Sequence, residues 1–227
     1  MKNNMIYKMR TSILVILLFA IISPSLTADA KQLPKNDNAS KVIVIDPCGQ
    51  ENDNDKKEPV GPGAFKSIPE VSDEYDSDTN LQIAEQLGVI LAEQGYTVIL
   101  TRDTNDIDIS NSGRAMIANT SNADILVAIS GKEKAGLNII CQTSDNPYNY
   151  GNYQNSRLLS DAILGSVNQN GKIEKSKVVE SDEEAIINWC AVPTAKVQIG
   201  SDNINDDTKR DLAKGIADGI NSYFAQK

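Results

Sequence analysis

Few side chains in this sequence could support catalysis, because histidine is missing from all 227 residues. The polar residues best placed for chemistry lie in or just after short apolar runs, and they are Asp46, Cys48, Ser130 and Gln198. A Cys–His nucleophile would need the missing histidine. A helix N-terminus or a lysine could still lower the pKa of Cys48, but we interpret this residue as a small structural one. Catalytic zinc usually has three protein ligands, most often including His. The residue types therefore argue against both kinds of catalytic site.

The apolar runs alternate with helical patterns along the chain. Short runs rich in branched apolar residues predict strands at 42–45, 96–100, 125–129, 137–141, 177–179 and 197–199. Apolar residues spaced by three or four positions predict helices at 79–94, 110–120, 155–167 and 208–224. Gly95 is placed to end the first helix and Ser110 to cap the second.

This alternation predicts an α/β fold, an open, mostly parallel twisted sheet with helices on both faces. Ligands of such sheets sit outside the carboxyl ends of the strands. The residues just after Ile45, Ile129 and Val197 are therefore the ones to examine. From Asp46 to Asp78 the chain is rich in Pro, Gly, Asp and Asn. A connection of this length is usually functional or disordered.

The first 30 residues read as a secretory signal peptide. Lys2, Lys8 and Arg10 precede an apolar run, and the small-residue site Ala28-Asp29-Ala30 follows it. The alternative is an uncleaved anchor, but the apolar run stops before the roughly 18 to 20 residues that a membrane span needs. We therefore expect export, cleavage after Ala30 and no stable membrane insertion afterwards. Residues 31–40 are polar and predict a flexible lead-in, and 41–227 predict one α/β domain.

The net charge of −9 excludes one large class of partner. An acidic chain repels phosphate backbones and gains nothing from counterion release. We therefore expect no binding to nucleic acid. The 40% of hydrophobic residues is ordinary for a folded globular protein.

Several motifs, in order along the chain, resemble the zinc-dependent N-acetylmuramoyl-L-alanine amidases, a family of cell-wall hydrolases. They are VIVIDP at 42–47, NLQIA at 80–84, GYTVILTR at 95–102, NSGRA at 111–115, INWC at 187–190, VP at 192–193 and GINSYF at 219–224. The resemblance implies an amidase-like α/β fold. It also implies a zinc ion, held by two His and one Glu, that activates water to cleave the amide between muramic acid and the stem peptide, with a second Glu for the proton.

Each of these functional positions carries a different residue here. The two His positions fall at Gly49 and Ser130, the ligand Glu at Asp76 with Glu74 nearby, and the catalytic Glu at Gln198. Glycine offers no ligand, serine is a poor zinc ligand and an amide cannot take a proton, so only the carboxylate of Asp76 could act as in the family. Seen through the resemblance, Gly49, Asp76 and Ser130 are degenerate metal positions and Gln198 a degenerate catalytic one. We expect no zinc and no other cofactor.

The resemblance also suggests what such a protein would bind. We expect a secreted, extracellular or cell-wall-associated pseudoenzyme that binds peptidoglycan or muropeptides, or an envelope protein. The alternatives are an interaction partner of an active envelope enzyme and an active amidase with unconventional ligands. Arg114, Tyr148 and Tyr150 could line a substrate groove, although Arg114, like Arg102, could instead pair with a carboxylate of the fold.

Three cysteines in an exported chain allow one disulfide. We expect it between Cys141 and Cys190, because Cys48 falls on the edge that carries the metal in the family. The alternative is three buried thiols.

Overall fold

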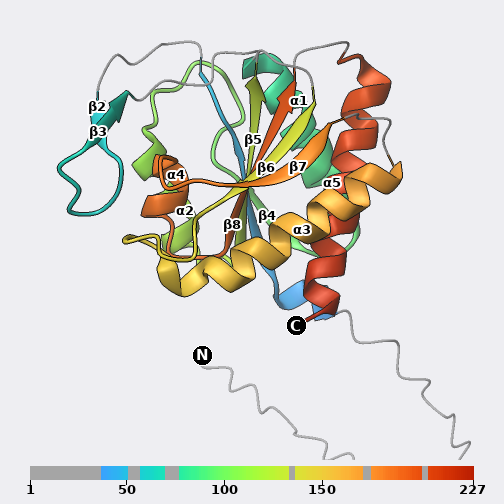
Figure 1. Ribbon diagram of the computed structural model, residues 1–227. Coiled ribbons are helices and arrows are strands. Elements are labelled where there is room, and N and C mark those ends of the chain that lie inside the picture. The colour runs from blue at the N-terminus through green and yellow to red at the C-terminus, as the bar shows by residue number, and fades with distance from the viewer. Residues whose placement is uncertain (1–36, 51–56, 70–76, 133–135, 171–174, 201–203) are drawn as a thin grey trace, which may run out of the picture. The chain divides into compact units, whose positions relative to one another are not determined.

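The computed structural model describes residues 37–50, 57–69, 77–132, 136–170, 175–200 and 204–227, which belong to one compact unit (Figure 1). The predicted signal peptide and most of the lead-in lie outside these residues. Among the described residues, no helix is long and apolar enough to cross a membrane.

A six-stranded sheet forms the centre of the fold, with the strand order β4-β1-β5-β8-β6-β7. Its strands are β1 (Val42–Pro47), β4 (Thr97–Leu100), β5 (Ile125–Lys132), β6 (Leu137–Cys141), β7 (Ser176–Glu180) and β8 (Thr194–Gly200). Neighbouring strands run parallel except at β6 and β8, which pair antiparallel. The predicted mostly parallel sheet is confirmed, and each predicted strand is present.

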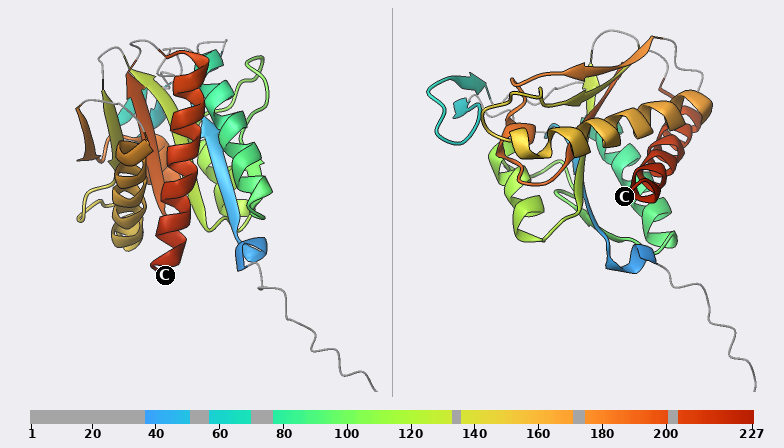
Figure 2. Two further views of the ribbon diagram at one scale, coloured as in Figure 1. Left: turned by 90° about the vertical axis from the view of Figure 1, so that its right-hand side faces the viewer. Right: turned by 60° about the horizontal axis from the view of Figure 1, so that its bottom comes forward.

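Helices cover both faces of this sheet, as predicted (Figure 2). They are α1 (Ser77–Glu93), α2 (Asn111–Thr120), α3 (Tyr153–Asn170), α4 (Ala185–Trp189) and α5 (Asp206–Ala225). One buried cluster joins α1, α3 and α5 to the sheet, and a second joins α2 and α4 to the opposite face. Side chains of a strand alternate between the two faces, so Ile43 and Ile45 lie in the first cluster and Val44 in the second.

The helix ends follow the signals in the sequence. Gly95 has a φ of 92°, a left-handed conformation that glycine adopts without strain, and it ends α1. Ser110 caps α2, because its hydroxyl accepts a hydrogen bond from the backbone N–H of Gly113. The short helix α4 was not predicted, since five residues show no clear period.

The last four residues of the predicted lead-in belong to the described part of the chain. Residues Asp37–Ser40 form the 3-10 helix η1. The Asn38 side chain donates a hydrogen bond to the Gln94 carbonyl at 3.0 Å, and this contact ties η1 to the end of α1. A contact across more than fifty positions leaves no local pattern in a polar segment.

The long segment after β1 contains a hairpin that the sequence did not predict. Strands β2 (Lys57–Pro59) and β3 (Ser67–Pro69) pair antiparallel, apart from the main sheet. Two neighbouring side chains of α4 hold the hairpin at the end of β2. Trp189 Nε1 donates to the Pro59 carbonyl at 2.9 Å, and Asn188 Nδ2 donates to the Val60 carbonyl at 2.8 Å. The described part of the long segment is therefore fixed by residues distant in the sequence.

Helices α3 and α5 approach each other closely at a glycine. A β-carbon at Gly219 of α5 would meet Ile163 Cα and lie 2.9 Å from the Ile163 nitrogen of α3. Backbone atoms cannot move away as a flexible side chain can. This packing therefore requires glycine at position 219.

We predict that Gly219→Ala lowers the free energy of unfolding by about 1–3 kcal/mol or more, because overpacking a rigid contact forces the backbone to shift. Gly165→Ala in α3 is the matched control, since a β-carbon there meets nothing within 4 Å. It should stabilise the helix by up to about 1 kcal/mol. Urea unfolding followed by circular dichroism measures both; equal effects would contradict the close approach.

Candidate functional site

Of the four positions that the resemblance assigns to metal binding or catalysis, three meet at one end of the sheet. Ser130 of β5 and Gln198 of β8 are paired neighbours on adjacent parallel strands. Gly49 lies just beyond β1, and the preceding Cys48 N–H donates to the Ile129 carbonyl of β5 at 2.8 Å. The fourth position, Asp76, lies outside the described residues.

These residues lie on the face of the sheet that α2 and α4 cover. Ile129 and Val197 belong to the cluster under α1, α3 and α5. Because side chains alternate along a strand, the next residues, Ser130 and Gln198, point to the other face. Ser130 is fully buried, and no described residue hydrogen-bonds to its hydroxyl. Gln198 is half-buried and its Oε1 accepts a hydrogen bond from Asn138 Nδ2 of β6 at 3.2 Å. The strand ends thus carry a row of neutral hydrogen-bonding groups.

The residues present at this end do not fit a zinc ion. Gly49 has a φ of 82° and no side chain, and hydroxyl and amide groups are poor substitutes for imidazole and carboxylate. Within the described ranges, no group of three or more His, Cys, Asp or Glu side chains could hold a metal. Cys48 and Asp46 do meet, since the Cys48 thiol donates to Asp46 Oδ2 at 3.2 Å, but two ligands are too few for a zinc site.

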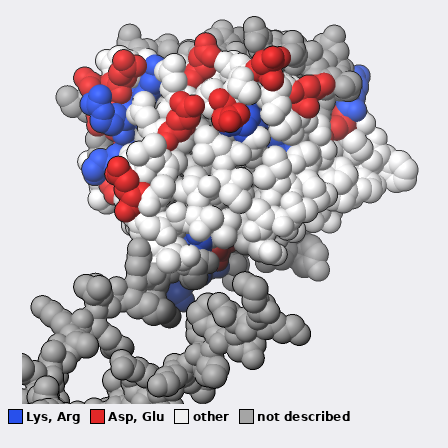
Figure 3. All heavy atoms as spheres, turned by 180° about the vertical axis from the view of Figure 1, so that it is seen from behind, with Lys and Arg blue, Asp and Glu red and all other residues white. Residues whose placement is uncertain are grey.

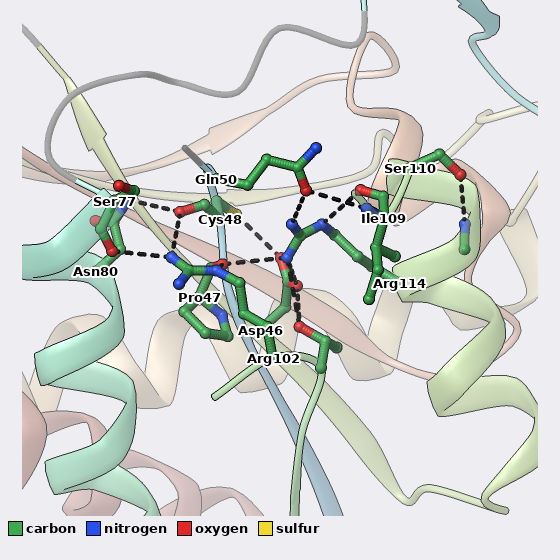
Figure 4. Close-up of polar contacts among 12 residues, drawn as sticks. Asp46, Pro47, Cys48, Gln50, Ser77, Asn80, Arg102, Ile109, Ser110 and Arg114 are labelled. Carbon is green, nitrogen blue, oxygen red and sulfur yellow. Dashed lines mark hydrogen bonds and ion pairs between the residues drawn. The ribbon is translucent and has the colours of Figure 1, made fainter. Parts of the chain in front are cut away.

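A buried ion pair holds the end of β1 (Figure 4). Arg114 Nη1 of α2 lies 2.8 Å from Asp46 Oδ1, with side-chain exposures of 4% and 0%. The hydroxyl of Thr101 also donates to Asp46 Oδ1. Burial alone would raise the pKa of Asp46, but the charge of Arg114 and the hydrogen bonds from Thr101, Arg114 and Cys48 together lower that pKa below its usual value.

The remaining nitrogens of Arg114 fix the chain beyond β1. Nη2 donates to Gln50 Oε1 at 2.9 Å and Nε to the Ile109 carbonyl at 3.2 Å. The guanidinium is therefore directed into the fold. This agrees with the alternative that Arg114 pairs with a carboxylate of the fold instead of lining a substrate groove.

The Arg102 side chain supports the same turn by donating hydrogen bonds to backbone carbonyls. Its Nε donates to the Pro47 carbonyl at 2.7 Å, and its Nη2 donates to the carbonyls of Cys48 at 3.3 Å and Ser77 at 2.9 Å. Asn80 Nδ2 of α1 donates to the same Cys48 carbonyl at 2.9 Å. Burial and the nearby charge of Arg114 lower the pKa of Arg102. Two arginines and one asparagine thus set the path of the chain into Gly49.

Of the two expected groove tyrosines, Tyr148 lies beside the hairpin. Tyr148 is half-buried, and its ring packs so closely on Gly61 that a β-carbon there would lie 2.5 Å from Tyr148 Cγ. Tyr150 begins the 3-10 helix η2 (Tyr150–Asn152), and its side chain is not among those described. The structure therefore places Tyr148 against the hairpin that α4 holds.

A network of amides that sequence reasoning missed connects these parts. Asn146 Nδ2, in the loop after β6, donates to Asn188 Oδ1 at 2.8 Å and to Asp182 Oδ1 at 2.6 Å. Asn188 in turn donates to the carbonyls of Val60 and Asp182, each at 2.8 Å. The INWC motif marks one member, but the partners are too far apart in sequence to produce a pattern.

A buried lysine on β8 was also missed. Lys196 is only 8% exposed, and its Nζ lies 3.0 Å from Glu184 Oε2, just before α4. It faces the same side of the sheet as Gln198, two residues further along β8. A charged residue interrupts the apolar pattern, so the sequence predicted this strand only from residue 197 onward.

The predicted Cys141–Cys190 disulfide is wrong, because both residues are free and buried. Ile140 of β6 packs in the α2 and α4 cluster. Cys141 is the next residue of the strand, so its thiol faces the other side of the sheet, toward Ser160 of α3. Cys190 packs in the α2 and α4 cluster itself. The sheet separates the two thiols. Burial raises the pKa of Cys141 to about 11 and raises that of Cys190 as well.

Known proteins agree with this architecture. A family model described as N-acetylmuramoyl-L-alanine amidase matches residues 43–222. No curated protein matches the chain. Among solved structures, the N-acetylmuramyl-L-alanine amidase Ami1 of Mycobacterium smegmatis has a TM-score of 0.72 and 14% identity, covering 84% of this chain and 99% of that one.

Two further structures have similar scores. The N-acetylmuramoyl-L-alanine amidase of Clostridium difficile 630 gives a TM-score of 0.61 at 22% identity, covering 82% of this chain and 98% of that one. The CwlD amidase of Clostridioides difficile, in complex with the GerS lipoprotein, gives 0.61 at 18% identity, covering 82% and 100%. At these identities the structures show a shared fold.

We predict that Asp46→Asn lowers the free energy of unfolding by about 3–5 kcal/mol, because it leaves the charge of Arg114 buried and unpaired. Asp161→Asn is the matched control. Asp161 pairs with Arg157 on the surface, at side-chain exposures of 50% and 41%, and its loss should cost less than about 1 kcal/mol. Urea unfolding at neutral pH compares the two; similar losses would contradict the central role of the buried pair.

The same pair should make stability depend on acid pH. The folded-state pKa of Asp46 is lowered, so its contribution is complete above the unfolded pKa of about 3.9 and is lost as the pH falls through the folded pKa. We expect the stability difference between the wild type and Asp46→Asn to shrink below about pH 4. Urea unfolding at a series of acid pH values tests this; a difference independent of pH would exclude titration of Asp46.

Proposed function

The chain belongs to the N-acetylmuramoyl-L-alanine amidase family, and on that premise we propose that it is an exported member that binds peptidoglycan or muropeptides without cleaving them. Its position would be secreted, extracellular or associated with the cell wall. The proposal combines a conserved architecture with an altered set of side chains at the strand ends.

The observation that carries the proposal is the pairing of Ser130 with Gln198 at the end of the sheet. The positions that resemble a family His and Glu are here neighbours that carry only a hydroxyl and an amide. The half-buried Gln198 amide can hydrogen-bond to the amides and hydroxyls of a sugar-peptide polymer, but neither it nor the buried Ser130 hydroxyl can activate water. The buried Ser130 hydroxyl, without a partner among the described residues, is costly for folding alone.

We further propose that the protein uses no zinc or other cofactor. A metal ion in such a site supplies the activated water, and Gly49, Ser130 and Gln198 offer it neither imidazole nor carboxylate. The carboxylate of Asp76, outside the described residues, would be a single ligand. Without the metal the nucleophile itself is lost, and positioning of the substrate cannot replace it.

Export rests on the pattern of the first 30 residues alone. The basic start, the apolar run and the Ala28-Asp29-Ala30 site together support cleavage and release. Peptidoglycan lies outside the membrane, so the proposed location and the proposed ligand agree.

A second candidate function is regulation through a protein partner, favoured by Phe65. This side chain is fully exposed in the loop between β2 and β3, while the hairpin is held by Asn188 and Trp189. A fixed, exposed aromatic residue is a common anchor of protein interfaces. The CwlD structure, a complex of an amidase with a lipoprotein, shows that a protein of this fold can bind a partner.

Pelleting with insoluble peptidoglycan tests the first proposal. We predict that the wild type sediments with the wall material and that Gln198→Ala lowers the bound fraction several-fold, because a truncated side chain loses its hydrogen bonds. Gln154→Ala is the matched control, an exposed glutamine of α3 on the other face of the sheet. It should sediment like the wild type. Digestion of muropeptides by the wild type should release no stem peptide.

Other results distinguish the alternatives. Wild-type protein that stays in the supernatant contradicts wall binding, and capture of an envelope protein that is lost in Phe65→Ala then supports the partner role. Stoichiometric metal, together with release of stem peptides that a chelator abolishes, contradicts the proposed inactivity and supports an amidase with unconventional ligands.

A further inference from the structure

The two edges of the sheet differ in charge. At one edge, β7 carries the exposed residues Lys177 and Glu180. At the other edge, β4 reads TVIL and has no charged side chain. Charged residues on an edge strand hinder its pairing with other strands. The β4 edge lacks this protection.

The outer side of β4 offers backbone groups to another strand. The N–H groups of Thr97 and Thr101 donate to carbonyls of β1, each at 3.0 Å. Backbone groups alternate in direction along a strand, so those of Val98 and Leu100 point away from β1. Within the described residues, β4 pairs with β1 alone.

Acidic side chains border this edge. Glu85 and Glu93 of α1 and Asp103, just after β4, are all exposed. Between the two glutamates lies Val89, which is 59% exposed. Residues four positions apart lie on the same side of a helix, so the two glutamates and the valine form one exposed row on α1. Helix α1 packs on β4.

Figure 3 views the molecule from behind Figure 1, the side on which α1 and β4 lie. The charged side chains gather along the top and one side of a broad area without charge. The outward backbone groups fit an extended segment, and the acidic border favours one that carries positive charge.

A segment of this kind directly precedes the described residues. Residues 31–36, here called the arm, read KQLPKN, with Lys31 and Lys35 on either side of Leu33 at a spacing of two. The arm leads into η1, which is hydrogen-bonded to the end of α1, just before β4. The arm therefore joins the described chain at the start of the unpaired edge.

We propose that the arm forms a short strand antiparallel to β4, on its outer side. The inference goes beyond the proposed function and takes from it only the cleavage after Ala30. Pro34 sets the register, because it has no N–H and must lie where the strand makes no hydrogen bond to its neighbour. That place is opposite Ile99, whose backbone groups point to β1.

This register supplies the partners that β4 lacks. Lys35 faces Val98, and the two residues exchange both of their backbone hydrogen bonds. Leu33 faces Leu100 in the same way. Directly opposed residues point to the same face of a sheet. The side chains of Leu33 and Lys35 therefore lie on the face that α1 covers.

The side chains of the arm then match those of α1. The arm and α1 both run opposite to β4, so the lysine–leucine–lysine order of the arm meets the glutamate–valine–glutamate order of the helix. Two residues of a strand span about 6.6 Å and four residues of a helix about 6 Å, so the two rows keep in step. The α-amino group freed by cleavage adds a further positive charge near Asp103.

The connection to β1 has a suitable length. Asn36 of the arm lies opposite Thr97, and Val42 of β1 pairs with Thr97 on its other side. The link must therefore cross two strand spacings, roughly 10 Å. The four residues of η1, at about 2 Å each, cover most of this distance, and Lys41 completes it. Because the arm is tethered, a short pairing is enough to hold it.

Hydrogen exchange of the mature chain, residues 31–227, tests the pairing at the two outward amides. We predict that Val98 and Leu100 are protected in the wild type. Lys31→Glu combined with Lys35→Glu should speed their exchange roughly tenfold or more, because like charges then oppose the arm. These substitutions lie outside the folded domain, so circular dichroism should be unchanged.

Lys177→Glu combined with Lys214→Glu is the matched control, because these exposed lysines of β7 and α5 give the same change in net charge. Its outward β4 amides should exchange like those of the wild type. Unprotected amides in the wild type overturn the proposal, as do equal effects of the two double variants. Peptidoglycan takes no part in the measurement, so its outcome is independent of wall binding.

A disulfide tests the register itself. Pro34→Cys combined with Ile99→Cys places two thiols at a non-hydrogen-bonded pair, where the Cα atoms of opposed residues are about 4.5 Å apart, within disulfide range. Lys35→Cys combined with Ile99→Cys is the matched control, since residue 35 points to the other face. The native thiols are buried. Only the first pair should oxidise readily, and equal cross-linking of both pairs overturns the proposal.

Discussion

The ion pair between Asp46 and Arg114 fixes the chain at the end of β1, and the geometry of the candidate site depends on it. Both charges are buried, and each needs the other as a partner. Arg114 also binds Gln50, while Arg102 and Asn80 hold the carbonyls of Pro47 and Cys48. Gly49 therefore occupies a fixed place beside β5.

The turn after β1 and the side chains at the strand ends have separate physical requirements. The turn after β1 requires buried arginines, a carboxylate and precise backbone hydrogen bonds, whatever lies at its tip. The positions of Ser130 and Gln198 follow from strand pairing, which involves backbone atoms and is indifferent to the side chains. Side chains at strand ends can therefore change while the sheet stays the same. This independence explains how an amidase fold can persist with a different set of chemical groups.

Long-range amide contacts make a second rigid unit around α4. Asn146 and Asn188 join the loop after β6, the β2–β3 hairpin and α4. Each of these buried amides donates to a carbonyl or carboxylate of another segment. The hairpin thus presents Phe65 from a fixed base.

The sequence by itself determined the order and type of the strands and long helices, the caps at Gly95 and Ser110, and the residue types at the strand ends. These depend on local period and local chemistry, which a single chain displays directly. Only the tertiary structure decided that Arg114 points into the fold, that a hairpin forms within the long segment, and that the sheet separates Cys141 from Cys190. It also revealed Lys196 as a buried ion-pair partner. Such features depend on which residues from distant segments meet, and on which face of the sheet each one lies.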